Sequence, residues 1–270
     1  MSNPLVSVIV PTKNSSEFLD ACLESIKDQT YKNIELIVVD NNSTDNTKEI
    51  ARKYTDKVFN HGPERSVQRN FGAKESTGVY VLFIDSDMEL AKEVVEECVK
   101  KEQATGTMGV VIPEESFGIG FWAQCKKLER SFYVGVEWME AARFFSRKSF
   151  EQVSGYNEQM ISGEDWDLSQ RVEEIGKIDR IGAFIYHNEG QLRLSELLKK
   201  KYYYAQKFAT YTIQNKSNSK LKKQVGGVRR FGLFFSKPFR LFKNPFVGIG
   251  MLFMKTCEFA AGVVGYVKLR

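Results

Sequence analysis

Cysteine and histidine are scarce in this 270-residue chain, which has four cysteines and two histidines. The cysteines, at positions 22, 98, 125 and 257, are scattered, and none forms a C-x-x-C pair. This distribution argues against a disulfide framework or a zinc site and favours a reducing compartment. The start, MSNPLVSVIVPTKN, has no basic segment before its apolar run. We therefore expect a first strand there rather than a signal peptide.

Glycine-rich phosphate motifs are also missing. Gly118-x-Gly120 and Gly248-x-Gly250 begin a G-x-G-x-x-G pattern, but neither has the third glycine, and there is no Walker lysine motif. If the protein binds phosphates, a divalent cation held by carboxylates is the obvious device. Mg²⁺ prefers one or two protein carboxylates together with phosphate oxygens.

Acidic residues are nearly absent from the last part of the chain. Residues 191–270 contain 17 of the 39 Lys and Arg but only 2 of the 34 Asp and Glu, so their net charge is +15 against −10 for residues 1–190. The same segment is rich in aromatic residues, which makes a merely solvated charged face less attractive. An acidic body with a basic, aromatic tail predicts that the tail meets an anionic partner.

Strand and helix patterns alternate along the first part of the chain. Apolar runs predict strands at residues 5–11, 34–40, 57–60, 79–85 and 108–113, and helical spacing predicts helices at 16–29, 41–54, 65–76 and 91–103. Short connections between them indicate an α/β fold with an open, Rossmann-like, mostly parallel sheet flanked by helices. Farther on we expect a helix at 117–134, strands at 141–147, 177–181 and 183–187, and a helix at 162–176. A long helix from residue 191 and a polar linker at 215–223 follow.

The stretch VYVLFIDSDMEL, residues 79–90, ends an apolar run on two acids one residue apart. A run without alternation suits a strand buried on both faces, and ligands of such sheets bind at the carboxyl ends of the strands. Asp85 and Asp87 at alternate positions of an extended chain point to the same side. On local sequence alone they predict either a cation site or turn residues that cap the next helix.

Four stretches, in order, resemble the family 2 glycosyltransferases with a GT-A fold, which use nucleotide-activated sugars. They are VSVIVPTKN (6–14), IELIVVDNNSTDNT (34–47), RNFGAKESTGVYVLFIDSDM (69–88) and SGEDWDLSQR (162–171). Each is weak alone, but four at family-like spacing, spread between residue 5 and about residue 190, are specific.

The resemblance implies a nucleotide site at the strand ends. Many members have two acids where this chain has Asp40 and Asn41, and this difference leaves the base open, because an amide both donates and accepts while a carboxylate only accepts. The alternatives are that Asp40 or Ser43 caps the next helix and that Arg69 forms a surface ion pair. The residues implied to bind the donor nucleotide are Pro11, Thr12, Asn14, Asp40, Asn41, Arg69, Asp85 and Ser86.

The resemblance also implies a metal ligand and a catalytic base. Asp87 would hold Mg²⁺ or Mn²⁺ beside the donor diphosphate, with His187 as a further ligand, although a lone histidine is more often structural. In the acidic motif Glu164-Asp165, Asp165 would take the proton of the acceptor hydroxyl. The alternative is that Ser162 and Asp165 form an S-x-x-D capping box. Trp166 would contact the acceptor or fill the core.

The basic tail predicts a second domain. We expect a catalytic domain at residues 1–190 and a helical, membrane-associating extension at 191–270. LRLSELLKKKYYYAQKF suits an interfacial helix on an anionic membrane surface. Residues 246–267 have the length to span a bilayer, but Lys255 and Glu258 make helices lying on the cytoplasmic face, peripheral or monotopic, the preferred reading. A tail folded back on its own catalytic domain is the alternative.

These observations predict an inverting, metal-dependent glycosyltransferase that moves a sugar from a nucleotide-sugar donor to a membrane-proximal acceptor. A polyprenol-linked saccharide or phosphate is the expected acceptor, and we expect no nucleic-acid partner. One alternative is a sugar-1-phosphate nucleotidyltransferase, which would need a Gly-rich loop with Arg and Lys after the first strand, where this chain has PTKNSSEF. Another is a non-catalytic protein that binds anionic lipid and carries a degenerate catalytic domain.

Overall fold

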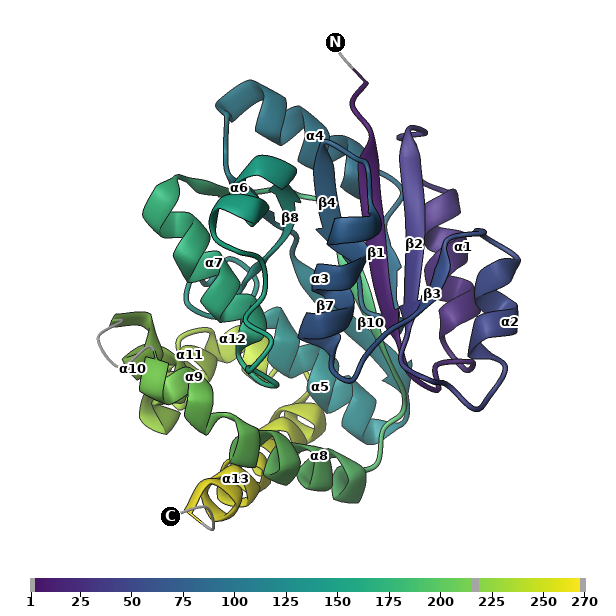
Figure 1. Cartoon of the computed structure of the whole chain (residues 1–270). Coiled ribbons are helices and arrows are strands. Elements are labelled where there is room, and N and C mark those ends of the chain that lie inside the picture. Colours follow the sequence, from purple (N-terminus) through teal and green to yellow (C-terminus); the bar gives the residue numbers. More distant parts are fainter. Residues whose placement is uncertain (1–2, 215–218, 268–270) are drawn as a thin grey trace. The chain divides into compact units, whose positions relative to one another are not determined.

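The structure, a computed structural model, describes residues 3–214 and 219–267 (Figure 1). The chain forms two compact units. The first contains residues 1–113, 141–158 and 164–187, and the second contains residues 114–140, 159–163 and 188–270. Residues 114–140 thus belong to the same unit as the basic tail. The division into a catalytic domain and an extension at residue 190 stays a prediction.

A seven-stranded sheet forms the centre of the first unit, with the strand order β3-β2-β1-β4-β8-β6-β9. Strands β3, β2, β1 and β4 are parallel, β8 is antiparallel to β4 and β6, and β9 is parallel to β6. The strands are β1 (Val6–Thr12), β2 (Ile34–Asp40), β3 (Val58–Asn60), β4 (Tyr80–Phe83), β6 (Gly109–Val111), β8 (Ala142–Ser146) and β9 (Ile178–Arg180).

Helices cover both faces of this sheet, which explains why its strands read as continuous apolar runs. Successive residues of β1 point to opposite sides, so Val8 packs into one core cluster and Ile9 into the other. Figure 1 shows α3 over the face of β1 and β2 that is turned to the viewer. The helices of this unit are α1 (Leu19–Lys27), α2 (Thr47–Arg52), α3 (Arg65–Glu75), α4 (Val94–Thr105), α6 (Arg147–Gln152) and α7 (Glu164–Ile175).

The second unit is mainly helical and has its own core. Its helices are α5 (Phe121–Ser131), α8 (Leu194–Lys207), α9 (Ala209–Gln214), α10 (Ser219–Val225), α11 (Gly227–Phe235), α12 (Pro238–Leu241) and α13 (Pro245–Val267). Phe132, Phe234 and Met251 are among the fully buried residues of this core. A three-stranded sheet has the order β5-β10-β7, with β5 (Met88–Leu90), β7 (Glu114–Ile119) and β10 (Ile185–Gln191). The chain passes from the first unit to the second within β10.

Most predicted elements are present, and four predictions need correction. The helix expected at 117–134 begins only at Phe121, because residues 114–119 form β7 and Gly118 and Gly120 have positive φ. The helix expected at 41–54 is confined to Thr47–Arg52. The long helix from residue 191 is divided into α8 and α9 at Phe208. In the linker expected at 215–223, residues 215–218 lie outside the described residues and the rest belongs to α10.

Candidate active site

The ends of β1 and β2 meet through a buried hydrogen-bond network. Parallel pairing sets Thr12 opposite Asp40, and the Thr12 hydroxyl donates to Asp40 Oδ1 over 3.0 Å. The backbone N–H of Ser43 donates to Asp40 Oδ2 over 2.8 Å. Asp40 is completely buried, so these bonds hold the turn after β2. The helix-cap alternative for Asp40 and Ser43 is wrong, because α2 begins at Thr47 after Asn46.

The other polar residues expected at these strand ends lie on the same turns. Asn14 has a positive φ of 48°, and its side-chain oxygen accepts from the backbone N–H of Thr44 over 2.9 Å. The amide of Asn41 donates to the carbonyl oxygen of Pro63. The Ser86 and Ser15 hydroxyls lie 2.9 Å apart and join the turn after β4 to the loop after β1. Pro11 is buried within β1.

Arg69 on α3 is completely buried among three carboxylates. Its Nη2 lies 2.6 Å from Asp85 Oδ1, and its Nη1 lies 3.0 Å from Asp165 Oδ1 and 3.5 Å from Glu164 Oε1. Burial by itself would lower the pKa of Arg69, but Asp165 and Asp85 outweigh this effect and raise the pKa well above its usual value. Such a guanidinium is permanently charged, and its fork of donors fixes the carboxylates around it. The surface-ion-pair alternative for Arg69 is wrong, since its side chain has no exposed surface.

Asp85 is held as a carboxylate by two arginines. Burial alone would raise the pKa of Asp85, but Arg69 and Arg143 outweigh it and lower it well below its usual range. The Arg143 Nη1 atom lies 3.5 Å from Asp85 Oδ2. Asp85 is thus ionised at neutral pH, at the edge of the sheet where ligands of such folds bind.

Asp165 lies in the first turn of α7, with one oxygen held and a quarter of its side chain exposed. The Tyr156 hydroxyl donates to Asp165 Oδ1 over 3.1 Å, and the Arg69 guanidinium stacks on the Tyr156 ring, 5.0 Å from its centroid. Because α7 begins at Glu164, Ser162 lies two residues before the helix start, one residue farther than the alternative, a capping box, requires. Glu164 is buried and bonds Arg65 over 3.1 Å. Burial, together with Asp165, raises the pKa of Glu164.

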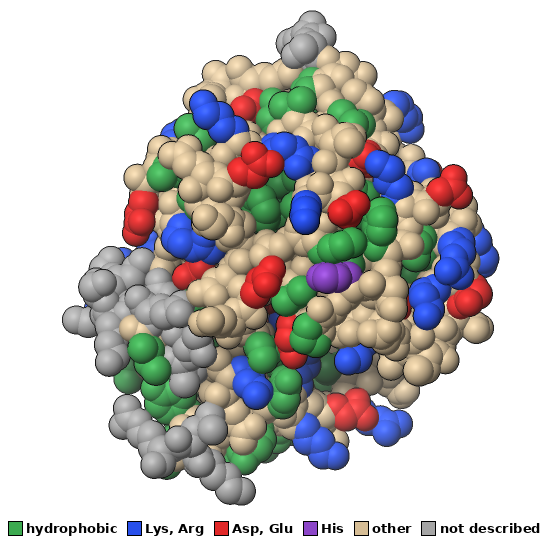
Figure 2. Space-filling view, in the orientation of Figure 1, with side chains coloured by type: hydrophobic (Ala, Val, Ile, Leu, Met, Phe, Trp, Pro, Cys, Tyr) green, Lys and Arg blue, Asp and Glu red, His purple; other side chains and the backbone are tan. Residues whose placement is uncertain are grey.

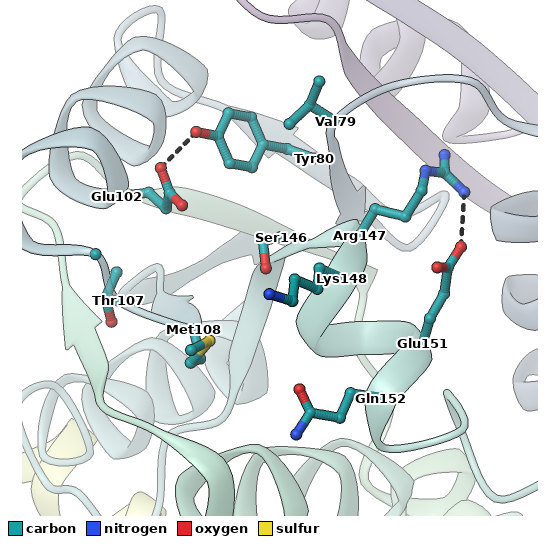
Figure 3. Close-up of a pocket in the computed structure, with 11 residues that line it drawn as sticks. Val79, Tyr80, Glu102, Thr107, Met108, Ser146, Arg147, Lys148, Glu151 and Gln152 are labelled. Atoms are coloured by element: carbon teal, nitrogen blue, oxygen red, sulfur yellow. Dashed lines mark hydrogen bonds and ion pairs between the residues drawn. The ribbon is translucent and has the colours of Figure 1, made fainter.

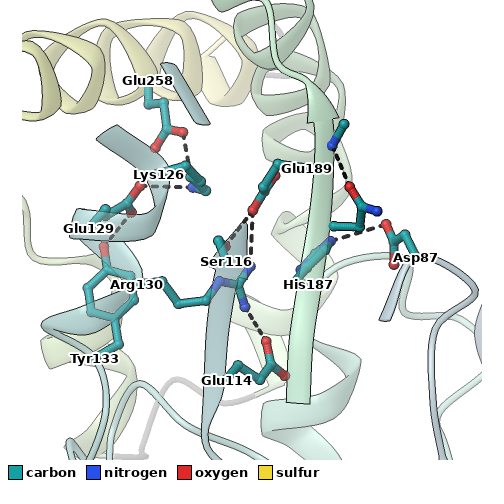
Figure 4. A network of polar contacts seen from close by, with 12 residues as sticks. Asp87, Glu114, Ser116, Lys126, Glu129, Arg130, Tyr133, His187, Glu189 and Glu258 are labelled. Carbon is teal, nitrogen blue, oxygen red and sulfur yellow. Dashed lines mark hydrogen bonds and ion pairs between the residues drawn. The ribbon is translucent and has the colours of Figure 1, made fainter. Parts of the chain in front are cut away.

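Asp87 and His187 form a pair in the first unit (Figure 4). Antiparallel pairing of β5 and β10 sets His187 opposite Met88, the neighbour of Asp87. As a result His187 Nε2 lies 3.1 Å from Asp87 Oδ2. A carboxylate oxygen and an imidazole nitrogen are both metal donors, but among the described residues no three His, Cys, Asp or Glu side chains form a cation site. This donor set fits a cation that takes its remaining ligands from substrate phosphates and water.

Three residues at this site were not predicted from the sequence. Gln68 on α3 donates to the carbonyl oxygens of Thr12, over 2.9 Å, and Val39, over 2.6 Å. Arg143 on β8 contacts Asp85, and Tyr156, in the loop after α6, contacts Asp165. A charged residue within the apolar run AARFF is a signal that could have identified Arg143. Trp166, the predicted acceptor contact, is half-buried on α7.

A separate hollow of about 750 Å³ lies in the first unit (Figure 3). Tyr80, at the start of β4, lines it, whereas Asp85 follows the other end of that strand. Its Arg147 side chain already donates to the carbonyl oxygen of Gly78 over 2.7 Å and to that of Ala73 over 2.9 Å. Arg147 therefore has a structural role, and none of the predicted site residues lines this hollow.

Structural comparison agrees with the arrangement of strands and helices. A mannosyltransferase from Pyrobaculum calidifontis, solved with GDP-Man and Mn²⁺, superposes with a TM-score of 0.64 at 15% identity, covering 99% of this chain and 88% of that one. Residues 1–349 of Staphylococcus aureus TarS superpose with a TM-score of 0.56 at 16% identity, covering 98% and 90%. Both similarities support the GT-A fold alone.

Comparison with known sequences identifies the family of this chain. The chain is 26% identical over 222 residues to the GalNAc(5)-diNAcBac-PP-undecaprenol beta-1,3-glucosyltransferase of Campylobacter jejuni, covering 78% of this chain and 65% of that protein. It is 32% identical over 137 residues to the glycosyltransferase GlyA of Streptococcus pneumoniae, covering 48% of this chain but only 18% of GlyA. Residues 7–155 match the model of the family described as Glycosyl transferase family 2. Because the matched residues make up more than half of this chain, the chain belongs to glycosyl transferase family 2.

Proposed function

We propose that this protein is a glycosyltransferase that transfers a sugar from a nucleotide-sugar donor to a membrane-proximal acceptor, uses a divalent cation and inverts the anomeric carbon. The observation that carries the proposal is the cluster around Arg69. One buried guanidinium bonds both Asp85, at the strand end, and Asp165, in the first turn of α7. A donor-side acid and a candidate base are thereby fixed within reach of one substrate.

Asp165 is the proposed general base. Its Oδ1 accepts from Tyr156 and Arg69, which leaves Oδ2 to take the proton of the acceptor hydroxyl. The acceptor oxygen then forms its bond to the anomeric carbon from the face opposite the nucleotide diphosphate. The bond from that carbon to the diphosphate oxygen breaks, and its electron pair leaves with the nucleotide diphosphate. Attack opposite the leaving group inverts the configuration.

Donor binding is assigned to the strand ends. We propose that Thr12, Asn14 and Asn41 line the nucleotide site, together with Pro11, Asp40, Asp85 and Ser86. In this proposal Arg69 orients Asp85 and Asp165 and does not contact the nucleotide, because its two terminal nitrogens already bond Asp85, Glu164 and Asp165. Asp87 and His187 would hold Mg²⁺ or Mn²⁺, which would neutralise the charge of the departing diphosphate.

The acceptor is proposed to be lipid-linked, a polyprenol-bound saccharide or phosphate. Two observations support this: the name of the Campylobacter relative includes PP-undecaprenol, and residues 191–270 carry a net charge of +15. We propose that this segment associates with the anionic cytoplasmic face of a membrane, where such an acceptor would be held, and that Trp166 contacts the acceptor.

Replacement of the proposed base tests the mechanism. In Asp165→Asn the amide still bonds Tyr156 or Arg69 but cannot take a proton. Donor binding should persist while transfer falls by about 10²–10⁴-fold, the usual contribution of a general base. The measurement is release of nucleotide diphosphate from UDP- and GDP-sugars with Mn²⁺ and with EDTA, alongside calorimetry of donor binding. Asp179→Asn, on β9 and paired with Lys177, is the matched control. Near-normal turnover of Asp165→Asn would exclude it as the base.

A further inference from the structure

Helix α13 buries its two charged residues and exposes a row of apolar residues. Lys255 and Glu258 are 2% and 3% exposed. The exposed residues of Pro245–Val267 are, by contrast, all uncharged, and after Pro245 they recur every three or four positions along one face. We call them the outer stripe: Phe246, Ile249, Phe253, Thr256, Ala260, Val263, Val264 and Val267. This is the reverse of an ordinary surface helix, whose polar face is turned to water.

The buried charges are neutralised by α5, within the same unit (Figure 4). Lys255 Nζ lies 2.5 Å from Glu129 Oε1 and 2.6 Å from Glu258 Oε2. Lys126 Nζ lies 2.8 Å from Glu129 Oε2 and 3.4 Å from Glu258 Oε1. Two cations and two anions on two helices are therefore paired with one another. This network fixes which face of α13 is turned to the protein and leaves the outer stripe largely exposed. Within the stripe, the Phe253 ring also lies 6.4 Å from that of Trp122.

The outer stripe is long and contains almost no hydrogen-bonding groups. From Phe246 to Val267 it extends about 32 Å at 1.5 Å per residue. The side chains of Phe246, Ile249 and Phe253 are 82%, 61% and 55% exposed. The single hydroxyl on the stripe, that of Thr256, already donates to the carbonyl oxygen of Leu252 in the same helix over 2.9 Å. A protein partner would ordinarily meet about one hydrogen bond per 100–200 Å² of interface.

The chain leading into α13 combines exposed aromatic and basic residues. Phe239 is 94% exposed and Phe242 is 44% exposed, and Arg240 and Lys243 between and beside them are exposed as well. Aromatic rings with neighbouring basic residues suit the boundary between acyl chains and anionic headgroups. Figure 2 shows hydrophobic side chains with Lys and Arg beside them on the lower part of the viewed face, where Figure 1 draws α8 and α13.

Length and composition alone would allow α13 to cross a bilayer. Its packing does not. The inner face of α13 requires α5 and also packs on α8, which have 11 and 14 residues, whereas a spanning helix needs about 20. If α13 crossed the membrane without these helices, it would expose Lys255 and Glu258 to hydrocarbon at a cost that such residues rarely bear.

We propose that α13 lies in the plane of an anionic membrane and inserts its outer stripe into one leaflet, while Arg240 and Lys243 contact the headgroups. The inference rests on the proposed membrane association of the enzyme. It specifies which face of α13 meets the membrane and how deeply that face inserts. The source of binding is then mainly apolar burial, assisted by the two exposed cations near the N-terminus of α13.

The test compares full-length variants on vesicles of phosphatidylcholine alone and with phosphatidylglycerol. Ile249→Glu/Phe253→Glu places two charges on the outer stripe without touching the buried network. The partition coefficient on anionic vesicles should fall at least about tenfold, since two buried apolar side chains are lost. Val79→Glu, at an exposed apolar residue of the first unit, should bind like the wild type. For the wild type, high salt should weaken binding without abolishing it, and alkaline carbonate should release the protein.

Three outcomes would overturn the inference. Unchanged vesicle binding of the double variant would exclude the outer stripe, and carbonate-resistant wild type would indicate a spanning helix. A concentration-dependent dimer in sedimentation, lost in the double variant and without vesicle binding, would assign the stripe to a second copy of the chain. Thermal melting of the double variant verifies its fold. Release of nucleotide diphosphate in solution is a separate readout, so failure of membrane binding and failure of the proposed chemistry are distinguishable.

Discussion

At the scale of single residues, Tyr156 supports the candidate base through one hydrogen bond. Burial, together with Asp165, raises the pKa of Tyr156 well above its usual value, so the phenol stays protonated and donates at neutral pH. Tyr156→Phe keeps the ring under Arg69 and removes only this donor. We expect kcat to fall by roughly ten- to a hundredfold, the equivalent of one hydrogen bond to a charged group, while the KM for the donor stays unchanged.

Tyr54→Phe is the matched control for this prediction. The Tyr54 hydroxyl also donates to a carboxylate, that of Asp20, over 3.1 Å, but at an exposed position away from the sheet edge. Steady-state kinetics with varied donor and fixed acceptor compare the two variants. A change in KM without a change in kcat, or equal effects of the two substitutions, would contradict a positioning role for Tyr156.

The sequence predicted the acids of the site better than their partners. Asp85 and Asp87 were identified because they end an apolar strand, and the resemblance gave them roles. Tyr156 could not be identified, because it follows a loop whose approach to α7 is set by tertiary packing. The sequence also could not show that Arg69 is buried among carboxylates. Helical spacing alone is compatible both with a surface ion pair and with a contact to the nucleotide.

At the scale of elements, the charge network of α13 predicts unequal effects of its members. Lys201 of α8 is a third cation near Glu129 and Glu258. Glu258 by itself would raise the pKa of Lys201, but burial together with Lys126 and Lys255 outweighs this effect and lowers the pKa to about 8. The network is therefore slightly rich in positive charge. Glu258→Gln should destabilise the protein by roughly 3–5 kcal/mol, as expected for a buried pair that loses one partner, and Lys255→Met should cost less.

The double variant Lys255→Met/Glu258→Gln supplies the control. It leaves Lys126 and Glu129 paired at 2.8 Å, so its loss of stability should be smaller than the sum of the two single losses. Urea unfolding of all four proteins measures the free energies. Additive losses, or a larger loss for Lys255→Met, would show that the four groups do not act as one network.

Helices and strands with a clear apolar spacing could be predicted from the sequence. Those that depend on pairing with a strand far along the chain could not. The helix at residues 65–75 and the strand at 34–40 were predicted nearly to their ends, because apolar spacing defines them. The strand at 114–119 was missed, and its last three residues were predicted as the start of a helix at 117. The reason is that EESFGI has no alternation and its partner in the sheet, β10, lies about 70 residues farther along the chain. The charges of α13 were read as an obstacle to membrane insertion, and only packing shows that they face the protein.

At the scale of the whole molecule, each unit contains its own buried charges. In the first unit, Asp85 and Glu164 respond to acid in opposite directions, since the pKa of Asp85 is lowered and that of Glu164 is raised. In the second unit, Glu129 and Glu258 both have a lowered pKa. The sequence indicated an acidic body and a basic tail, but it could not reveal that residues 114–140 join the tail in one compact unit, because that grouping depends on contacts distant in sequence.

Acid should loosen α13 by protonating Glu258. Burial would raise the pKa of Glu258, but Lys126 and Lys201 outweigh it and lower it from 4.5 to about 2. The unfolded chain thus binds more protons than the folded one in this range, so the stabilisation from Glu258, about 3 kcal/mol at most, is present above pH 4.5 and is lost as the pH falls towards 2. Hydrogen exchange should show α13 losing protection as the pH falls from about 5 towards 2. Glu258→Gln, which has no proton to gain, should lose part of this pH dependence. An unaltered pH dependence in Glu258→Gln would show that the acid sensitivity of α13 does not originate in its charge network.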